Sequence, residues 1–298
     1  MIIDVHSHLG DILYPNGGDL ISRTGIEFPK STLIQRLYEK SLYRETPATQ
    51  IINAIFPMMF ANNERRRNFA ATLENFRASL DGTDITLCVC APIAPNNTFK
   101  DLLSAQNMDT RIIAFTSPDF SVSQTISMLL KDLPSAAGVK IHPILQEAEA
   151  DSGKVMEAVD AISSYSKPVL IHSGKAFYYT KREKKSRFSG FASIDKIERL
   201  IAAFPHVKFI VGHAGLYEVA QVIDLLPKYK NAYVDTSFQP PEAIKALVSA
   251  FGGEKVMFAS DWPYGLRLPA IQAVEQACRH DAALRKAVFY ENAAEILA

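Results

Sequence analysis

Eight short apolar runs, separated by longer amphipathic segments, are the feature that most restricts the fold of this chain. The runs are rich in Val, Ile, Leu and Phe, as expected for strands that are buried on both faces. Strands that alternate with helices form β/α units around a parallel sheet, and eight strands are what a closed barrel requires. The predicted strands are residues 1–8, 85–92, 111–116, 138–142, 169–173, 207–213, 232–236 and 256–261. The sequence therefore predicts an α/β fold of the (β/α)8 TIM-barrel type.

Apolar residues at helical spacing predict the helices between these strands. Ser193 is a candidate N-cap, and Pro241 and Pro269 lie near first helical positions. The predicted helices are residues 63–80, 121–131, 153–165, 193–203, 216–226, 240–251, 269–278 and 282–297. No domain boundary is predicted, so we expect residues 1–298 to form one domain.

Two connections are unusually long. One is an insertion after strand 1, residues 9–62, with a predicted helix near 32–43, and the other is residues 174–192. In a barrel both leave the carboxyl ends of strands, which is the catalytic face, where long loops commonly shape an active site.

Charge and composition exclude several classes of protein. The 32 Lys+Arg balance the 32 Asp+Glu, so no overall charge attracts the chain to nucleic acid or to an acidic membrane. No apolar run reaches the roughly 18 residues that a membrane helix needs, and the start MIIDVHSH has no features of a signal peptide. Three cysteines without regular spacing do not form a disulfide framework. We expect a cytoplasmic protein without a nucleic-acid or membrane partner.

Polar residues at the ends of the apolar strands are the informative part of the sequence. Five of the seven histidines lie at predicted strand ends, together with one lysine and two aspartates. These residues are His6, His8, Lys140, His142, His172, His213, Asp235 and Asp261. Since the carboxyl ends of barrel strands meet on one face, they are candidates for a single site.

The spacing of His6 and His8 favours a metal site. Side chains two apart on a strand share a face, so Asp4, His6 and His8 are predicted on one face while Val5 and Ser7 face the helices. Two imidazoles one pleat apart can bind the same ion. A His-x-His pair alone has no ligand role in most proteins, and its position at a strand end is what favours one here.

The other candidates each have a structural alternative. Asp261 can offset the charge of an ion or take a proton, or it can simply cap the following turn. His172 and His213 can instead be hydrogen-bonded core histidines. For Asp235 a supporting role is as plausible as any other.

Several short motifs resemble the amidohydrolase superfamily, and specifically its amidohydrolase-2 branch, which includes the aminocarboxymuconate semialdehyde decarboxylase-like enzymes. The motifs are DVHSH, GVKIHP, IHSG, VGHAG, ASDWPYG and the closing YENAAEIL. The resemblance implies that His6, His8 and His172 are metal ligands and that Asp261 is the carboxylate next to the metal. It also implies that His213 lies beside the ion as a catalytic partner of Asp261.

The resemblance implies a divalent metal, with zinc the first expectation and manganese or iron as alternatives. One ion is expected rather than two. Lys140 is the residue on which that number depends, because other superfamily members bridge two metals with a carboxylated lysine on strand 4. Lys140 can instead pair with a substrate carboxylate or with an interior acid, and His142 can also face the substrate or a second metal.

The first functional hypothesis is a hydrolase. It would use a metal-activated water on a small, carboxylated lactone, ester or amide, with Asp261 transferring the proton and His213 stabilising the oxyanion. The alternative is non-oxidative decarboxylation of a small unsaturated or aromatic carboxylic acid. A non-catalytic metal-binding barrel is the third possibility.

Residues on the long loops suggest further contacts with partners. A small anionic substrate would be held by basic side chains, the candidates being Arg23, Arg44, Lys175, Arg182 and Arg187. A homodimer interface is one use for an apolar patch of Phe28, Phe56, Met58, Met59 and Phe60, and packing against the barrel mouth is the other.

Overall fold

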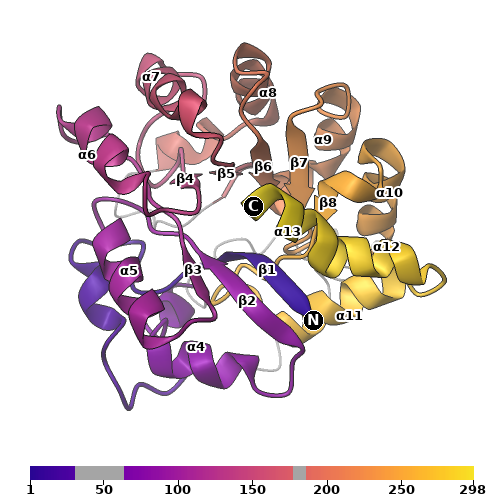
Figure 1. Ribbon diagram of the computed structural model, residues 1–298, viewed down its shortest axis with the longest axis horizontal. Coiled ribbons are helices and arrows are strands. Elements are labelled where there is room, and N and C mark those ends of the chain that lie inside the picture. The colour runs from indigo at the N-terminus through magenta and orange to yellow at the C-terminus, as the bar shows by residue number, and fades with distance from the viewer. Residues whose placement is uncertain (31–63, 177–185) are drawn as a thin grey trace.

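The computed structural model describes residues 1–30, 64–176 and 186–298, and it confirms the α/β barrel (Figure 1). All eight predicted strands are present, and every pairing between them is parallel. They are β1 Ile2–Ser7, β2 Ile85–Cys90, β3 Ile112–Ala114, β4 Val139–Ile141, β5 Val169–His172, β6 Phe209–Gly212, β7 Ala232–Asp235 and β8 Val256–Met257.

Two short junctions close the ring of strands. The order β1-β2-β3 forms one ladder and β4-β5-β6-β7-β8 forms the other. Single parallel bridges, Thr116 to Val139 and Ser7 to Trp262, join the ladders. The second junction is reinforced by the Asp261 amide, which donates to the His6 carbonyl (2.8 Å). This junction places the end of β1, which carries His6, beside the segment after β8, which carries Asp261.

Helices surround the strands on the outside, as the repeated β/α unit requires (Figure 1). They are α4 Leu73–Leu80, α5 Phe99–Met108, α6 Thr125–Asp132, α7 Gly153–Ile162, α8 Ile194–Ala203, α9 Val219–Leu225, α10 Pro241–Phe251, α11 Arg267–Ala277, α12 Ala282–Lys286 and α13 Asn292–Leu297. None of the helices predicted from the sequence corresponds to α5. Its start carries a capping box, with Thr98 and Asp101 bonding each other's backbone amides, and that T-x-x-D signal would have revealed it.

The single helix predicted over 63–80 is wrong. A short helix covers residues 64–68, and α4 begins only after Thr72. The Thr72 hydroxyl caps α4 by accepting a hydrogen bond from the Asn75 amide (3.1 Å). Between the two, the Ala71 carbonyl accepts from Gly10 and the Leu73 amide donates to Ile21. Tertiary pairing with the loop after β1 therefore replaces the helical hydrogen bonds of this segment.

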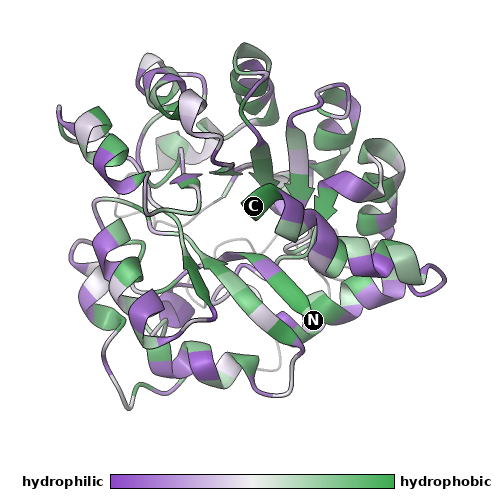
Figure 2. Ribbon diagram, in the orientation of Figure 1, coloured by the Kyte–Doolittle hydropathy of each residue, from purple (hydrophilic) through white to green (hydrophobic). Residues whose placement is uncertain are grey.

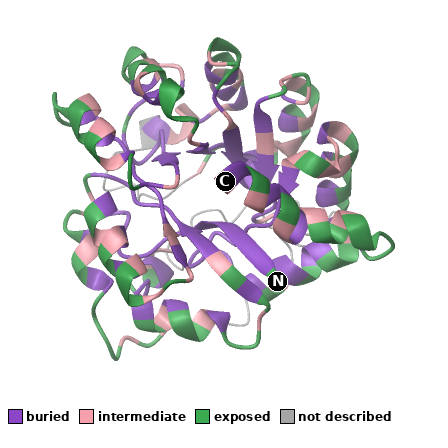
Figure 3. Ribbon diagram, in the orientation of Figure 1, coloured by how far each residue is buried: buried purple, intermediate pink, exposed green. Residues whose placement is uncertain are grey.

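The protein has two main apolar layers, one inside the barrel and one between strands and helices. Strand residues alternate between them, so Figure 3 shows the strands as buried and the outer helix surfaces as exposed. Figure 2 shows the matching polarity, with apolar strands and polar outer helix faces. The interior layer includes Val5, Val89 and Leu170, and Ala293 and Ile296 of α13 pack against it. The C-terminal helix thus contributes to the barrel core.

The predicted alternation along β1 is only partly correct. Val5 belongs to the interior layer, whereas the Asp4 carboxylate bonds Arg267 at the start of α11. Asp4 pairs with Cys88 and Ser7 with Cys90, so three steps on β1 match two on β2. Such a bulge re-aims the following side chain, which brings His6 to the barrel interior although Asp4 faces the helices.

Some predictions fall on residues that the structure does not describe. These are the helix near 32–43 and most of the long insertion, the basic run 181–187, and Arg44, Phe56, Met58, Met59, Phe60, Arg182 and the Arg187 side chain. In the described part of the chain, no helix is long and apolar enough to cross a membrane.

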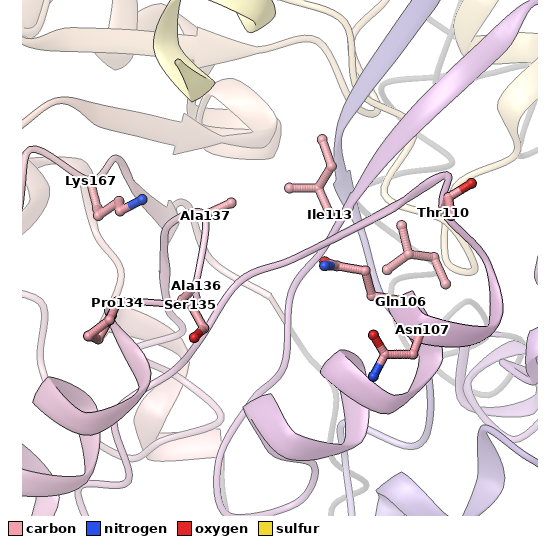
Figure 4. A pocket seen from close by; sticks show the side chains of 10 residues that line it. Gln106, Asn107, Thr110, Ile113, Pro134, Ser135, Ala136, Ala137 and Lys167 are labelled. Atoms are coloured by element: carbon pink, nitrogen blue, oxygen red, sulfur yellow. The ribbon is translucent and has the colours of Figure 1, made fainter.

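A cavity of about 550 Å³ lies beside β3, between the end of α5 and the segment that precedes β4 (Figure 4). Its lining includes Gln106, Thr110, Ile113, Ala137 and Lys167. Thr110, Ala137 and Lys167 precede β3, β4 and β5, which places the cavity at the amino ends of these strands. Active sites of barrels lie at the opposite, carboxyl end, so this cavity is not the catalytic one.

Candidate metal centre

His6, His8 and Asp261 converge at the carboxyl ends of β1 and β8. Their ligand atoms lie within 4.8 Å of one another, and all three residues are buried. Asp261 Oδ1 lies 3.5 Å from His6 Nε2 and 3.3 Å from His8 Nε2. The structure therefore brings together three of the four residues for which a ligand role is predicted.

Hydrogen bonds on both sides of the His6 ring define its tautomer. Lys140 Nζ, which can only donate, lies 2.7 Å from His6 Nε2. Asp235 Oδ2 lies 2.8 Å from His6 Nδ1 and accepts from it. His6 thus carries its proton on Nδ1 and has its lone pair on Nε2. Because this nitrogen has one lone pair, the Lys140 contact and an ion at His6 exclude each other.

His8 is held in the same way by the backbone. Its Nδ1 lies 2.7 Å from the Ala91 carbonyl, which can only accept, so Nδ1 carries the proton. The His8 Nε2 lone pair is then directed towards Asp261. A second partner on Nδ1 is the usual device by which proteins orient a metal-binding histidine.

His172 joins the centre through His213 rather than directly. Among the described residues, the groups whose ligand atoms lie within 4.8 Å are His6 with His8 and Asp261, and His6 with His213 and Asp235. His172 is in neither group. Its Nδ1 lies 3.1 Å from His213 Nε2, and the two rings meet edge to face.

His142 has the opposite hydrogen-bonding pattern. Its ring stacks on His172 at 4.0 Å with an interplanar angle of 9°. Its Nδ1 accepts from the Leu145 amide (3.3 Å), which places the imidazole proton on Nε2. In this tautomer His142 presents a donor, which suits a substrate oxygen and does not suit a metal ion.

Burial makes the imidazoles neutral. Burial, together with the charge of Lys140, lowers the pKa of His6 well below its ordinary value and that of His8 to about 3. Burial also lowers the pKa of Lys140, to about 8, against the opposing effect of Asp261 and Asp235. Lys140 therefore remains mostly an ammonium at neutral pH, while the histidines are in the form that binds metals.

Asp261 is a buried carboxyl with one oxygen that no described residue hydrogen-bonds. Burial raises the pKa of its carboxyl well above the ordinary value; Lys140 opposes this, and the charges of Asp235 and Glu64 add to it. Its Oδ1 is buried and accepts no hydrogen bond from the described residues. A buried carboxylate oxygen without a donor, facing two imidazole lone pairs, fits a divalent cation.

Local backbone geometry contributes to this convergence. His213 and Asp261 adopt positive φ angles of 62° and 53°, a conformation that side-chain-bearing residues seldom take. Gly212 leaves room for the His6 ring, because a Cβ there would lie 3.2 Å from His6 Cε1. The strand ends are thus bent to direct these side chains inward.

Apolar and aromatic residues from several loops form a wall at the barrel mouth that no sequence pattern predicts. Tyr264 lies 6.0 Å from the His8 ring and Phe238 lies 5.5 Å from the His213 ring, measured between centroids. The mouth wall consists of Ile12, Leu13, Ile93, Leu145 and Tyr264, with Tyr14 and Phe238 packed against them. These residues come from five separate loops and carry no periodic signal along the chain, so only the fold assembles them.

Three residues from the long loops do not join the centre. Lys175 pairs with Glu218 (3.4 Å), and Arg23 is exposed. Phe28 is partly buried and stacks on Trp262 at 6.1 Å. Phe28 therefore packs against the barrel.

The fold and this cluster define a class of protein: a (β/α)8 barrel with a histidine–carboxylate centre suited to a divalent ion at the carboxyl ends of its strands. The amidohydrolase family model, of the amidohydrolase-2 type, matches residues 3–298. The chain therefore belongs to this family, as its strand-end motifs indicate. A comparison with curated proteins finds no sequence that matches.

Solved structures share the fold at low sequence identity. The 5-carboxyvanillate decarboxylase of Sphingomonas paucimobilis is 14% identical over 99% of this chain and 98% of its own, with a TM-score of 0.62. The same enzyme of Novosphingobium aromaticivorans, complexed with manganese and a nitrobenzoic acid, is 17% identical over 100% and 96%, with a TM-score of 0.63. A probable 2-pyrone-4,6-dicarboxylic acid hydrolase of Acinetobacter baumannii is 14% identical over 99% and 98%, with a TM-score of 0.58. These likenesses confirm the barrel.

Proposed function

We propose that this protein is a metal-dependent, non-oxidative decarboxylase of a small aromatic or unsaturated carboxylic acid. The observation that carries the proposal is a buried ammonium, Lys140, beside the histidine–carboxylate centre and under an apolar mouth wall. An ammonium suits a carboxylate, and an apolar aromatic wall suits a planar ring. This reverses the order of the two hypotheses from the sequence, because two of the three similar structures named above are decarboxylases.

The ligands proposed for the ion are His6, His8 and His172 through Nε2, together with Asp261. When bound, a divalent ion supplies Lewis-acid charge that stabilises negative charge on substrate oxygens. Three imidazoles and one carboxylate suit zinc and equally admit manganese, which the Novosphingobium enzyme binds. We propose one ion, since Lys140 Nζ lies 2.7 Å from His6 Nε2 and an ammonium has no lone pair to offer a second ion.

Lys140 and His142 position the substrate in this proposal. Once the ion holds His6, the Lys140 ammonium loses that partner and is available to the substrate carboxylate. His142, with its proton on Nε2, donates to a second substrate oxygen. The two groups lie two residues apart on and just after β4, so both face the barrel interior.

Asp261 supplies the proton of the reaction. Burial raises the pKa of its carboxyl above the ordinary value, and this favours the protonated form that a proton donor needs. The bond between the substrate carbon and its carboxylate breaks, the electron pair stays on the carbon, and CO2 leaves. That carbon takes the Asp261 proton, and Asp261 is reprotonated from water, so charge and atoms balance.

Hydrolysis of a lactone, ester or amide is the second candidate. It is supported by the likeness to the probable pyrone-dicarboxylic acid hydrolase. In this reaction Asp261 would start as the carboxylate, take a proton from water and then give it to the leaving group. Both reactions use an anionic substrate near Lys140.

One experiment separates these two reactions. The purified protein, loaded with zinc or manganese, is incubated in D2O and, separately, in H2¹⁸O with hydroxybenzoic acids, unsaturated diacids and pyrone carboxylates. Decarboxylation releases CO2 and places one deuterium on the product carbon, whereas hydrolysis adds ¹⁸O and releases no CO2. Addition of ¹⁸O without CO2 would overturn the decarboxylase proposal, and chelator-treated protein serves as the control.

A further inference from the structure

A continuous chain of hydrogen bonds connects His6 to His172 through residues that are not proposed as ligands. Asp235 Oδ2 bonds His6 Nδ1 (2.8 Å), and Ser237 Oγ lies 2.5 Å from Asp235 Oδ1. Ser237 Oγ also lies 2.8 Å from His213 Nδ1, and His213 Nε2 lies 3.1 Å from His172 Nδ1. All five residues are buried. We call this chain the relay.

The carboxylate of Asp235 sets the direction of every bond in the relay. Its Oδ1 accepts from the backbone amides of His213 (2.9 Å) and Ser237 (3.0 Å). At 2.5 Å the Ser237 hydroxyl also donates to it, because two oxygens this close require a hydrogen between them. Ser237 has one hydrogen, so its oxygen can only accept from His213.

The consequence passes along the chain to His172. His213 must carry its proton on Nδ1 to donate to Ser237, which leaves its Nε2 as an acceptor. His172 then donates from Nδ1 to that nitrogen (3.1 Å), which leaves its lone pair on Nε2. The backbone of Gly174 also hydrogen-bonds the His172 side chain, so His213 is one of two groups that act on this ring. All three histidines proposed as ligands thus present the same atom, although His172 is reached by a different route from His6 and His8.

We propose that Ser237 is a positioning residue that fixes the tautomers of His213 and His172 and thereby holds His172 ready for the metal. The proposal rests on the metal role given to His172 in the proposed function. It also changes the role expected of His213. With Nε2 committed as an acceptor, His213 orients His172 and does not donate a hydrogen bond to a substrate oxyanion.

Three variants isolate the hydroxyl. Ser237→Ala removes the link between Asp235 and His213, and Ser237→Thr keeps a hydroxyl at the same position. Thr236→Val is the matched control, because it removes a buried hydroxyl from the residue just before Ser237. The Thr236 hydroxyl accepts a hydrogen bond from the Ala259 amide (3.2 Å) and is not part of the relay. Thermal unfolding shows that each variant is folded before it is compared.

The first measurement is the tautomer itself, which a purely structural role would not change. Imidazole ¹⁵N chemical shifts of metal-free, ¹⁵N-labelled protein distinguish a protonated Nδ1 from a protonated Nε2. We expect wild type, Ser237→Thr and Thr236→Val to show His213 and His172 protonated on Nδ1, and Ser237→Ala to show a mixture. An unchanged pattern in Ser237→Ala would overturn the proposal.

The second measurement is zinc affinity, by competition with a chromophoric chelator. Loss of a partner behind a metal-binding histidine typically weakens binding about 10- to 100-fold. We expect this loss in Ser237→Ala, recovery in Ser237→Thr, and less than about a threefold change in Thr236→Val. Equal losses in Ser237→Ala and Thr236→Val would refute a specific role for Ser237. Neither measurement depends on turnover, so both remain valid if the protein is a hydrolase. If the wild-type protein bound no zinc, that result would count against the proposed function, and the ¹⁵N chemical shifts would still test the relay.

Discussion

The buried ion pair between Asp4 and Arg267 offers the sharpest test of how the strand ends are held. Arg267 Nη1 donates to Asp4 Oδ2 at 2.5 Å, and the exposed side-chain fractions are 2% and 0%. Asp4 also accepts hydrogen bonds from the backbone amides of His6 (3.2 Å) and Ser260 (3.0 Å). His6 is itself a proposed ligand, and Ser260 directly precedes the proposed ligand Asp261. The guanidinium lies over the rings of Phe76 and Trp262. The pair thus stabilises the bulge of β1 and the segment after β8.

Replacing Arg267 with Met keeps the apolar contacts and removes the charge. It leaves a carboxylate in a dry environment with only neutral donors, for which a cost of about 3–5 kcal/mol is typical. An unfolding entropy of about 2.1 cal mol⁻¹ K⁻¹ per residue gives about 0.6 kcal mol⁻¹ K⁻¹ for 298 residues. The melting temperature of Arg267→Met should therefore fall by about 5–8 °C.

The assay is thermal unfolding followed by circular dichroism at one scan rate. Arg77→Met is the control, since Arg77 also bonds an aspartate, Asp109, but its side chain is 46% exposed and exposed pairs contribute about 0–1 kcal/mol. The double variant Asp4→Asn with Arg267→Met removes the unpaired charge and should be more stable than Arg267→Met alone. If Arg267→Met shifted the melting temperature no more than Arg77→Met does, or if the second substitution brought no recovery, the reasoning would be refuted.

Three further outcomes follow from the site and the surface. Asp261→Asn should lower kcat by at least about 100-fold while the protein still binds an ion through its histidines, as stopped-assay kinetics and metal analysis would show; full activity would exclude a proton-transfer role. Gly212→Ala should weaken metal binding about tenfold, because the new Cβ would lie 3.2 Å from His6 Cε1 and push the ring aside, and an unchanged affinity would contradict that steric role. The hydrogen bond from Arg111 holds the pKa of Asp109 well below its ordinary value. A depressed pKa stabilises the fold above the unfolded-state pKa, near 3.9, and this contribution disappears as pH falls through the folded value. Asp109→Asn should therefore be less stable than wild type at pH 7 by about 1 kcal/mol, with the gap in urea midpoints closing below about pH 3; a gap that is constant with pH would exclude the charge as its cause.

The sequence alone determined the barrel and most members of its centre. Eight apolar runs are visible because a strand that is buried on both faces must be apolar throughout, and a polar residue at its end is conspicuous for the same reason. His6, His8 and Asp261 were found in this way, and the structure brings them together. The missed helix α5 was readable too, from its capping box.

Tertiary structure decided what depends on contacts between distant segments. The bulge in β1 redirects His6 relative to Asp4, and pairing with the loop after β1 breaks the helix predicted over 63–80. Ser237 acquires its place only because β6 and β7 are neighbours, which sets its hydroxyl between Asp235 and His213. Sequence patterns report local periodicity and burial, whereas the direction of a hydrogen bond depends on which partners the closed barrel places within about 3 Å.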